Sequence, residues 1–183
     1  MQKEPNPVKD YLFDYLSKSE ERIQKLISEK KFSEIIDDVI ENCYDKIIRL
    51  GEKDESVGVL GTGLLHYLLT NALINSQRKV EHKGIEIDIV IPDIKTLEKD
   101  PKKTLLICIP KSSNKKIVEK IISQLEKIQS EKENIWVVLS ENISINKKYF
   151  VLSKENNSFS KIIFEIAQFS NVAGTNKFKI LPV

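Results

Sequence analysis

The sequence predicts an α/β protein, in which a mixed β-sheet is flanked by helices and preceded by an N-terminal helical extension. Residues 85–91 place isoleucine at every second position, which is the period of a β-strand. Two strongly apolar stretches, 104–109 and 135–139, enclose an amphipathic helical pattern at 114–130. That order is typical of a parallel βαβ unit. Residues 1–50 carry apolar side chains at helical spacing, which accounts for the extension.

The extension is predicted to contain two helices. The first follows Pro5 and Pro7, because proline is tolerated ahead of a helix or in its first turn. The second is capped by Ser33 and ends near Gly51. Their apolar stripes are Leu12, Leu16, Ile23 and Ile27, then Ile36, Val39, Ile40, Cys43 and Ile47. We therefore divide the chain into a helical extension, 1–50, and an α/β core, 51–183.

A third helix is predicted from Ser56 to Asn75. It is apolar on most sides, so it should lie buried in the centre of the fold. Gly58, Gly61 and Gly63 lie near its start, although glycine lowers helix stability. We interpret them as points of close packing against another backbone, because this stretch has neither a P-loop lysine nor a preceding strand.

The remainder of the core begins with a hairpin that leads into the isoleucine strand and ends at Pro92. The other expected elements are a charged loop at 95–103, strands at 104–109, 135–139 and 149–152, helices at 114–130 and 159–169, and an irregular tail. An antiparallel hairpin joined to a parallel βαβ unit gives a mixed sheet with helices on both faces.

Composition limits the classes of function. The 183 residues include 29 basic and 27 acidic side chains, a net charge of +2, so nucleic-acid contact would need a local basic patch. The N-terminus has no apolar signal region and no apolar run is long enough to span a bilayer, so we expect a cytoplasmic protein without membrane contact. Cys43 and Cys108 lie in apolar stretches and are predicted to be buried thiols.

Asp88 is the residue that most needs an explanation, because it interrupts an isoleucine-rich strand. In one interpretation it lies on the solvent face of the sheet beside Glu86. In the other it faces a cleft as a ligand of a hard cation such as Mg²⁺, which prefers carboxylate oxygens on rigid backbone.

The stretch Gly84-Ile-Glu-Ile-Asp88, the strand Leu105-Leu-Ile-Cys-Ile-Pro-Lys111 and the early Glu55 resemble the PD-(D/E)XK, or restriction-endonuclease-like, nuclease superfamily. The resemblance covers roughly residues 55–140. It implies a restriction-endonuclease-like core in which Asp88 and Glu55 hold Mg²⁺ for phosphodiester hydrolysis of DNA or RNA. Lys111 would stabilise the charge that develops on the phosphate.

One position departs from the family pattern. The acid expected two residues before the lysine is replaced by Ile109, and Pro110 removes a strand hydrogen-bond donor. Two explanations stay open. Either the site is inactive and the fold is kept for binding or assembly, or the acid has moved to the following helix as Glu119 or Glu126. Each of these glutamates is also explained as part of a solvated helix face.

Basic residues gather on both sides of the 104–109 strand. The set is Lys102, Lys103, Lys111, Lys115 and Lys116, with Asn114 at the start of the next helix. They are explained either as ordinary surface lysines or as an edge that contacts phosphate. His66 is predicted to lie in the core and His82 to be exposed in the hairpin turn, and their separation does not suit zinc.

The leading hypothesis is therefore a nuclease-like protein that associates with nucleic acid and has a degenerate site. The alternative is a structural or protein-interaction module whose N-terminal helices bind a partner protein or a second copy of the chain. A small-molecule enzyme is disfavoured, because no cofactor fingerprint is present.

Overall fold

The computed structural model describes residues 5–174, so the predicted irregular tail lies largely outside the described residues. The helices are α1 Pro7–Lys18, α2 Glu20–Ser28, α3 Phe32–Ile47, α4 Lys53–Asn71, α5 Ile94–Lys99, α6 Lys115–Leu125 and α7 Ile162–Val172. The strands are β1 Gln77–His82, β2 Ile85–Ile91, β3 Leu105–Cys108, β4 Ile135–Leu139 and β5 Lys148–Val151, and 3-10 turns cover Pro101–Lys103, Lys132–Asn134 and Ser158–Lys161.

The five strands form one mixed sheet in the order β1-β2-β3-β4-β5. β1 and β2 are an antiparallel hairpin, and β2 also pairs antiparallel with β3. β3, β4 and β5 are parallel, because α6 carries the chain back along the sheet between β3 and β4. The predicted fold class is thus confirmed, including the βαβ unit.

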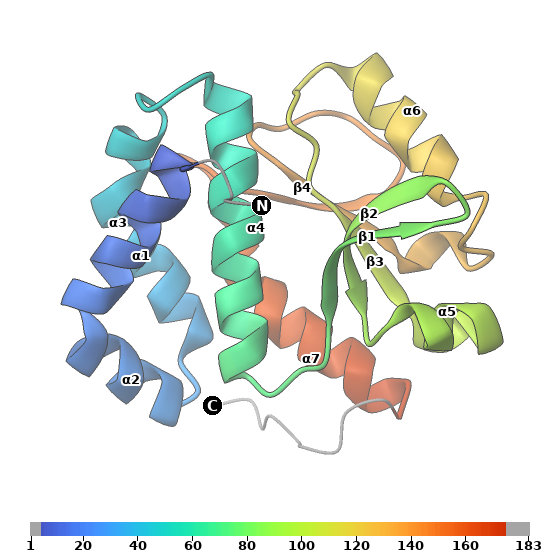
Figure 1. The fold of residues 1–183 in the computed structure, drawn as a ribbon, viewed down its shortest axis with the longest axis horizontal. Helices are drawn as coiled ribbons and strands as arrows, with labels where there is room; N and C mark the ends of the chain where they lie inside the picture. The colour runs from blue at the N-terminus through green and yellow to red at the C-terminus, as the bar shows by residue number, and fades with distance from the viewer. Residues whose placement is uncertain (1–4, 175–183) are drawn as a thin grey trace.

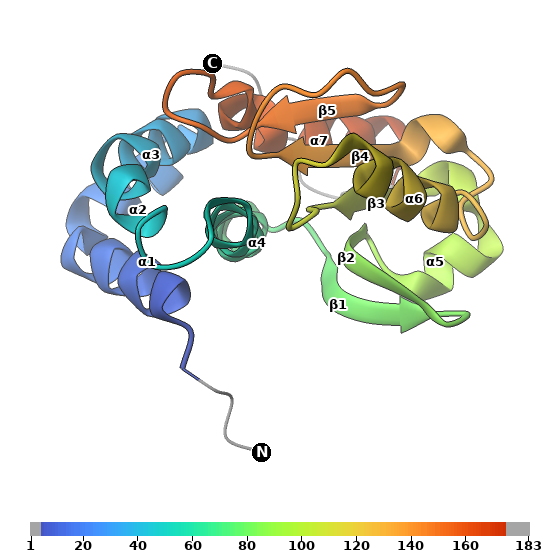
Figure 2. The same ribbon diagram turned by 90° about the horizontal axis from the view of Figure 1, so that it is seen from above.

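Helices cover both faces of this sheet (Figures 1 and 2). α4 lies between the N-terminal helices and the sheet, with α7 on the same side, whereas α5 and α6 cover the opposite face (Figure 2). The largest apolar core joins side chains from α1 to α4, from the sheet and from α7. Two smaller cores lie between the sheet and the helices α5 and α6. The N-terminal helices therefore share their core with the α/β part.

Within residues 5–50, the described part of the extension, there are three helices and not the predicted two. The helical stretch is interrupted at Ser19, which is the C-cap of α1 and the N-cap of α2. α3 begins at Phe32 after the left-handed residue Lys30, so Ser33 lies inside the helix and does not cap it. An apolar stripe continues across such a break, which is why helical spacing alone did not reveal it.

α4 begins earlier than predicted, because the Glu52 side chain accepts a hydrogen bond from the Glu55 backbone amide. Gly58 packs against the chain that follows β3, as predicted, but the approach does not require glycine. A Cβ there would lie 3.4 Å from the Lys111 side chain and 3.7 Å from the Pro110 carbonyl oxygen, which are ordinary contact distances. Gly61 and Gly63 instead face side chains of other elements.

Three further expectations need correction. Residues 95–103 form α5 and a 3-10 turn, because Asp93 caps α5 and accepts a hydrogen bond from the Thr96 amide at 2.7 Å. His82 is buried, with Nδ1 3.8 Å from Glu98 of α5. His66 is only half-buried, although it lies on α4.

Both predicted buried thiols, Cys43 and Cys108, are buried and free. Within the described part of the chain, none of the helices combines the length and the apolar character that a membrane crossing requires.

Candidate functional site

A cleft of about 610 Å³ lies where β2, the chain after β3 and α6 meet. Asp88 and Lys111, two of the three predicted catalytic residues, both line it. Glu55 lies beside it on the first turn of α4, where its Oε1 is 3.8 Å from the Lys111 ammonium. Both partners of that ion pair are more than half exposed, so the pair is weak.

Asp88 is held by two contacts. Its Oδ2 accepts a hydrogen bond from the Ile109 backbone amide at 2.7 Å, and its Oδ1 accepts one from the Lys79 ammonium at 2.9 Å. Only 19% of the Asp88 side chain is exposed, against 73% for Glu86. Asp88 therefore faces the cleft and the end of β3, whereas Glu86, which lines the same cleft, lies mostly in solvent.

A local distortion of the hairpin produces this orientation. Lys79 has a φ of 50°, in the left-handed region, directly across from Asp88. At this point the odd-numbered residues of β2 change the face of the sheet on which they lie. Ile87 packs toward α5 and α6, whereas Ile89 packs into the large core beneath α4. The Asp88 carboxylate satisfies the Ile109 amide where β2 separates from β3.

Ile109 belongs to the core, not to the cleft chemistry. It is 4% exposed and packs with α4, where a Cβ on Gly61 would lie 3.7 Å from its Cγ2. A hydrocarbon side chain cannot ligate a metal, so the position that the family pattern gives to an acid is filled by core packing. Pro110 and Lys111 follow the end of β3 and lie next to Gly58 of α4.

The donor set does not fit the Mg²⁺ that the resemblance implies. Mg²⁺ prefers carboxylate oxygens in near-octahedral geometry. Both oxygens of Asp88 are engaged, and Glu86, the other acid lining the cleft, is 3.8 Å from Lys79. Glu55, the second predicted ligand, lies beside the cleft and is 3.8 Å from the Lys111 ammonium. Among residues 5–174, no group of three or more histidine, cysteine or acidic side chains could hold a metal ion.

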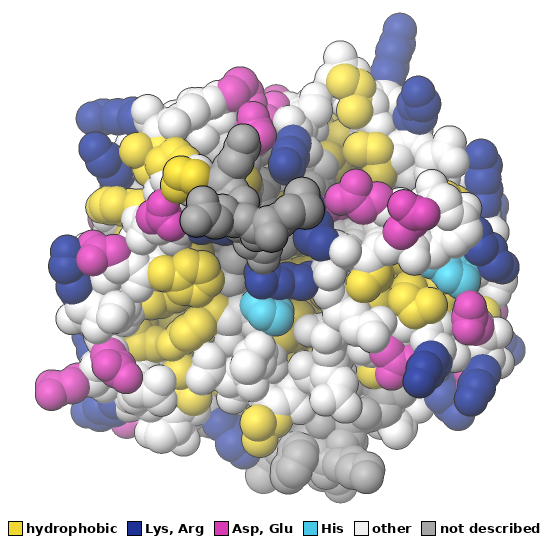
Figure 3. All heavy atoms as spheres, in the orientation of Figure 1, with side chains coloured by type: hydrophobic (Ala, Val, Ile, Leu, Met, Phe, Trp, Pro, Cys, Tyr) yellow, Lys and Arg dark blue, Asp and Glu magenta, His cyan; other side chains and the backbone are white. Residues whose placement is uncertain are grey.

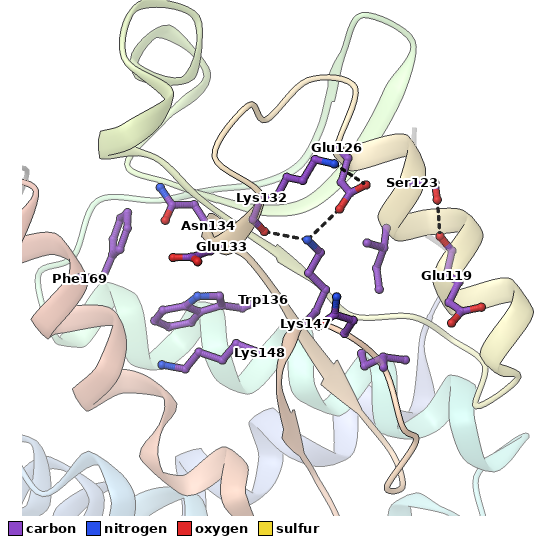
Figure 4. A pocket seen from close by; sticks show the side chains of 13 residues that line it. Glu119, Ser123, Glu126, Lys132, Glu133, Asn134, Trp136, Lys147, Lys148 and Phe169 are labelled. Atoms are coloured by element: carbon purple, nitrogen blue, oxygen red, sulfur yellow. Dashed lines mark hydrogen bonds and ion pairs between the residues drawn. The ribbon is translucent and has the colours of Figure 1, made fainter.

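The two glutamates considered as a displaced acid line a different hollow, of about 1050 Å³, between α6, β4, β5 and α7 (Figure 4). Glu126 forms an ion pair with Lys147 at 2.8 Å, and Glu119 lies 3.8 Å from Lys115. The α6 side chains that line the Asp88 cleft are instead Ile117, Ile121 and Gln124. The structure therefore does not bring either glutamate to Asp88.

The hollow in Figure 4 is built around Trp136, which is 6% exposed. The Lys148 ammonium lies 4.2 Å from the centre of the indole ring, and the rings of Phe150 and Phe169 pack at 5.8 and 6.2 Å. Lys148 also forms an ion pair with Glu165. The indole is thus covered by its own chain, so it offers no open face on which a nucleic-acid base could stack.

The predicted basic edge divides into two groups. Lys111, Lys115 and Lys116 follow β3, whereas Lys102 and Lys103 precede it and lie at the other end of the strand. The Asn134 amide fixes that other end by donating to the Lys102 carbonyl at 3.1 Å. On the face drawn in Figure 3, basic and acidic side chains are interspersed, without a broad area of one sign.

Asn114 caps α6, and its side-chain oxygen accepts hydrogen bonds from the amides of Lys116 and Ile117 at 3.0 and 3.4 Å. These two amides of the first turn of α6 are thus already paired within the chain. The lysine side chains remain the groups of this segment that could reach a phosphate.

A polar network near the cleft was not predicted. Asp54 of α4 accepts hydrogen bonds from the Ser113 amide at 2.7 Å and from the Ser140 hydroxyl at 2.6 Å, and the two hydroxyl oxygens are 2.9 Å apart. Burial alone would raise the pKa of Asp54, but the hydrogen bonds from Ser140 and Ser113 outweigh it and lower the pKa. The network connects the segment after Lys111 to the first turn of α4 and to the residue that follows β4. No local pattern joins residues so far apart in sequence.

Comparisons with known proteins return a structural likeness. Neither a protein family model nor a curated protein matches the sequence. The structure is similar to that of a restriction endonuclease, PspGI, in complex with its substrate DNA. The two chains are 18% identical, with a TM-score of 0.46, and the match covers 90% of this chain and 73% of the other.

Proposed function

We propose that this chain binds nucleic acid at the Lys111 cleft and does not catalyse Mg²⁺-dependent phosphodiester hydrolysis. One observation carries the second half of this proposal. Both carboxylate oxygens of Asp88 accept hydrogen bonds, one from Lys79 and one from the Ile109 amide, and Ile109 stands where the family pattern has its second acid. Activation of water by a divalent cation requires side chains that hold the ion, and within residues 5–174 no group of three or more histidine, cysteine or acidic side chains is placed to do so.

The binding half of the proposal rests on lysines. Lys79 and Lys111 line the cleft, and Lys115 and Lys116 follow on the exposed first turn of α6. Ammonium groups bind phosphate by charge and by counterion release, without a metal ion. Lys111 and its partner Glu55 are both more than half exposed, so exchange of that carboxylate for phosphate costs little, whereas Lys79 stays paired with the mostly buried Asp88.

The test of binding compares the two ends of β3. Fluorescence anisotropy with labelled DNA and RNA would be measured over a range of salt for the wild type and two charge-matched variants. The double variant Lys111→Glu/Lys116→Glu should bind weakly, and its salt slope should fall by about two, near 0.9 for each lost phosphate contact. The control Lys102→Glu/Lys103→Glu carries the same charge change at the opposite end of the strand and should bind as the wild type does.

Two results would contradict this placement. Equal weakening by both double variants would show a response to net charge and not to the cleft. Binding that is unchanged in the Lys111/Lys116 variant, or absent in the wild type, would remove the proposed function.

Cleavage is tested separately, with DNA and RNA substrates in Mg²⁺ or Mn²⁺ and Asp88→Ala alongside. We expect no cleavage by either protein. Metal-dependent cleavage by the wild type that disappears in Asp88→Ala would restore the catalytic role of Asp88. Cleavage that survives in Asp88→Ala would come from another site or from a contaminating nuclease.

The alternative function, a partner-binding module built on the N-terminal helices, stays a prediction. The apolar stripe residues Leu12, Leu16 and Ile23 are at most 4% exposed and pack within this chain, so a partner would have to use other side chains such as Phe13, which is 43% exposed. A solution-mass measurement tests this alternative directly. A strict monomer that binds DNA with steep salt dependence would count against it.

A further inference from the structure

One wall of the Lys111 cleft is aliphatic. Ile85 of β2 and Ile117 and Ile121 of α6 all line it. The core-facing stripe of α6 is made by Val118, Ile122 and Leu125, and the partly buried Ile121 and Ile85 pack against the same core from its edge, whereas Ile117 lies outside it.

Ile117 is 47% exposed, which is unusual for an isoleucine in a concave surface. The other large apolar side chains exposed within residues 5–174 lie on α1, on α7 and after α4, away from the cleft: Phe13, Phe164, Val172 and Leu73. The cleft thus combines the exposed Ile117 side chain with the ammonium group of Lys111, while Lys79 is paired with Asp88 in the same cleft. A ligand that fits both must carry an anion next to an apolar or aromatic body.

We infer that the cleft accepts an unpaired nucleotide, with its phosphate at Lys111 and its base against Ile117 and Ile121, so that the protein prefers single-stranded to duplex nucleic acid. This inference rests on the proposed function. A duplex presents phosphates on its outside but keeps its bases paired and stacked, so it could satisfy the lysines and leave the wall in water. An unpaired base has a free face, and covering the wall with it removes apolar surface from water.

The size and the chemistry of the cleft agree with this occupant. Its volume of about 610 Å³ lies in the range of small-ligand pockets, roughly 300–1,000 Å³. An aliphatic wall makes no hydrogen bonds to base edges, so contact with it should tolerate different bases. Trp136, the aromatic side chain that would otherwise attract attention as a stacking platform, is covered and lies in the other hollow.

The experiment measures binding of three labelled probes by anisotropy: a short single strand, the duplex that it forms with its complement, and an acidic peptide of similar net charge. The variants are Ile117→Ser and, as a matched control, Val172→Ser, which removes an exposed aliphatic side chain from α7. Thermal melting of both variants establishes that they fold.

We expect the single strand to bind about tenfold more tightly than the duplex, the equivalent of about 1.4 kcal/mol. Ile117→Ser should weaken single-strand binding about fivefold, leave duplex binding unchanged and so reduce the preference for the single strand. The reason is that the exposed half of the isoleucine side chain is no longer there to be buried by the base. Val172→Ser should change neither. Equal affinity for single strand and duplex, with Ile117→Ser like the wild type, would overturn this inference and leave the proposed function standing.

Other outcomes separate the two proposals further. No binding to either nucleic acid would remove the proposed function together with this inference. Binding of the acidic peptide, weakened by Ile117→Ser, with no binding of the single strand, would assign the cleft to a protein partner and overturn the inference as well.

Discussion

Replacement of Asp88 by alanine tests whether this carboxylate stabilises the fold or is held ready for chemistry. In the structure it accepts hydrogen bonds from the Ile109 amide at 2.7 Å and from Lys79 at 2.9 Å. A hydrogen bond to a charged group contributes about 1.5–3 kcal/mol, and an unsatisfied buried amide costs a similar amount. The ion pair adds at most about 1 kcal/mol, because Lys79 is 45% exposed.

These contributions overlap, so Asp88→Ala should lower the free energy of unfolding by about 2–3 kcal/mol. Two further variants divide this loss. Asp88→Asn keeps an oxygen that can accept from the Ile109 amide and should cost about 1 kcal/mol. Lys79→Met removes only the ammonium and should cost less than about 1 kcal/mol.

The measurement is urea unfolding followed by circular dichroism, with an unchanged m-value as the condition for comparing the variants. Melting offers a second measure, because each kcal/mol shifts Tm by about 2–4 °C for a chain of this size. An Asp88→Ala protein as stable as the wild type, or more stable, would refute the reasoning. Such a result is typical of a functional carboxylate that is held in place at a cost in stability.

Three other perturbations follow from the same structure. Because the pKa of Asp54 is lower in the folded state, this carboxylate contributes stability above about pH 4 that is lost as the pH falls through its folded pKa; Asp54→Asn should flatten that loss when the urea midpoint is measured against pH. Gly58→Ala should raise the free energy of unfolding by up to about 1 kcal/mol, because its Cβ would make an ordinary 3.4 Å contact, whereas Gly58→Leu should lower it because the larger side chain meets the backbone after β3. Urea unfolding of the two variants measures both changes, and a destabilised Gly58→Ala would contradict the packing described. Burial raises the pKa of Cys43 to about 12 and that of Cys108 further, so neither thiol should react with a chromogenic disulfide reagent until the protein is unfolded; rapid labelling of the native protein would contradict their burial.

The strands of this protein were predictable from the sequence alone. β2 coincides with the alternating stretch 85–91, and β4 coincides with the apolar stretch 135–139. The parallel pairing of β3 with β4 follows from the helix between them. These features could be predicted because hydrophobic period and connection length are local properties of a chain.

The break between α1 and α2 and the formation of α5 show where local patterns stop being sufficient. Ser19 interrupts a continuous apolar stripe, and Asp93 turns a charged stretch into a capped helix that buries Leu97. At Asp93 a side-chain hydrogen bond at the helix start decides the outcome, whereas Ser19 makes no such bond, and the surrounding composition reveals neither helix boundary.

The tertiary structure alone decided the arrangement of the site. The sequence predicted that Asp88, Ile109 and Lys111 lie at one cleft, but it could not show that Lys79 and the Ile109 amide would donate hydrogen bonds to the Asp88 carboxylate. Lys102 and Lys111 looked like one basic edge, although a strand separates them in space. The partner of a charged side chain depends on which elements pack together and on how a strand twists, and no periodicity along the chain encodes either.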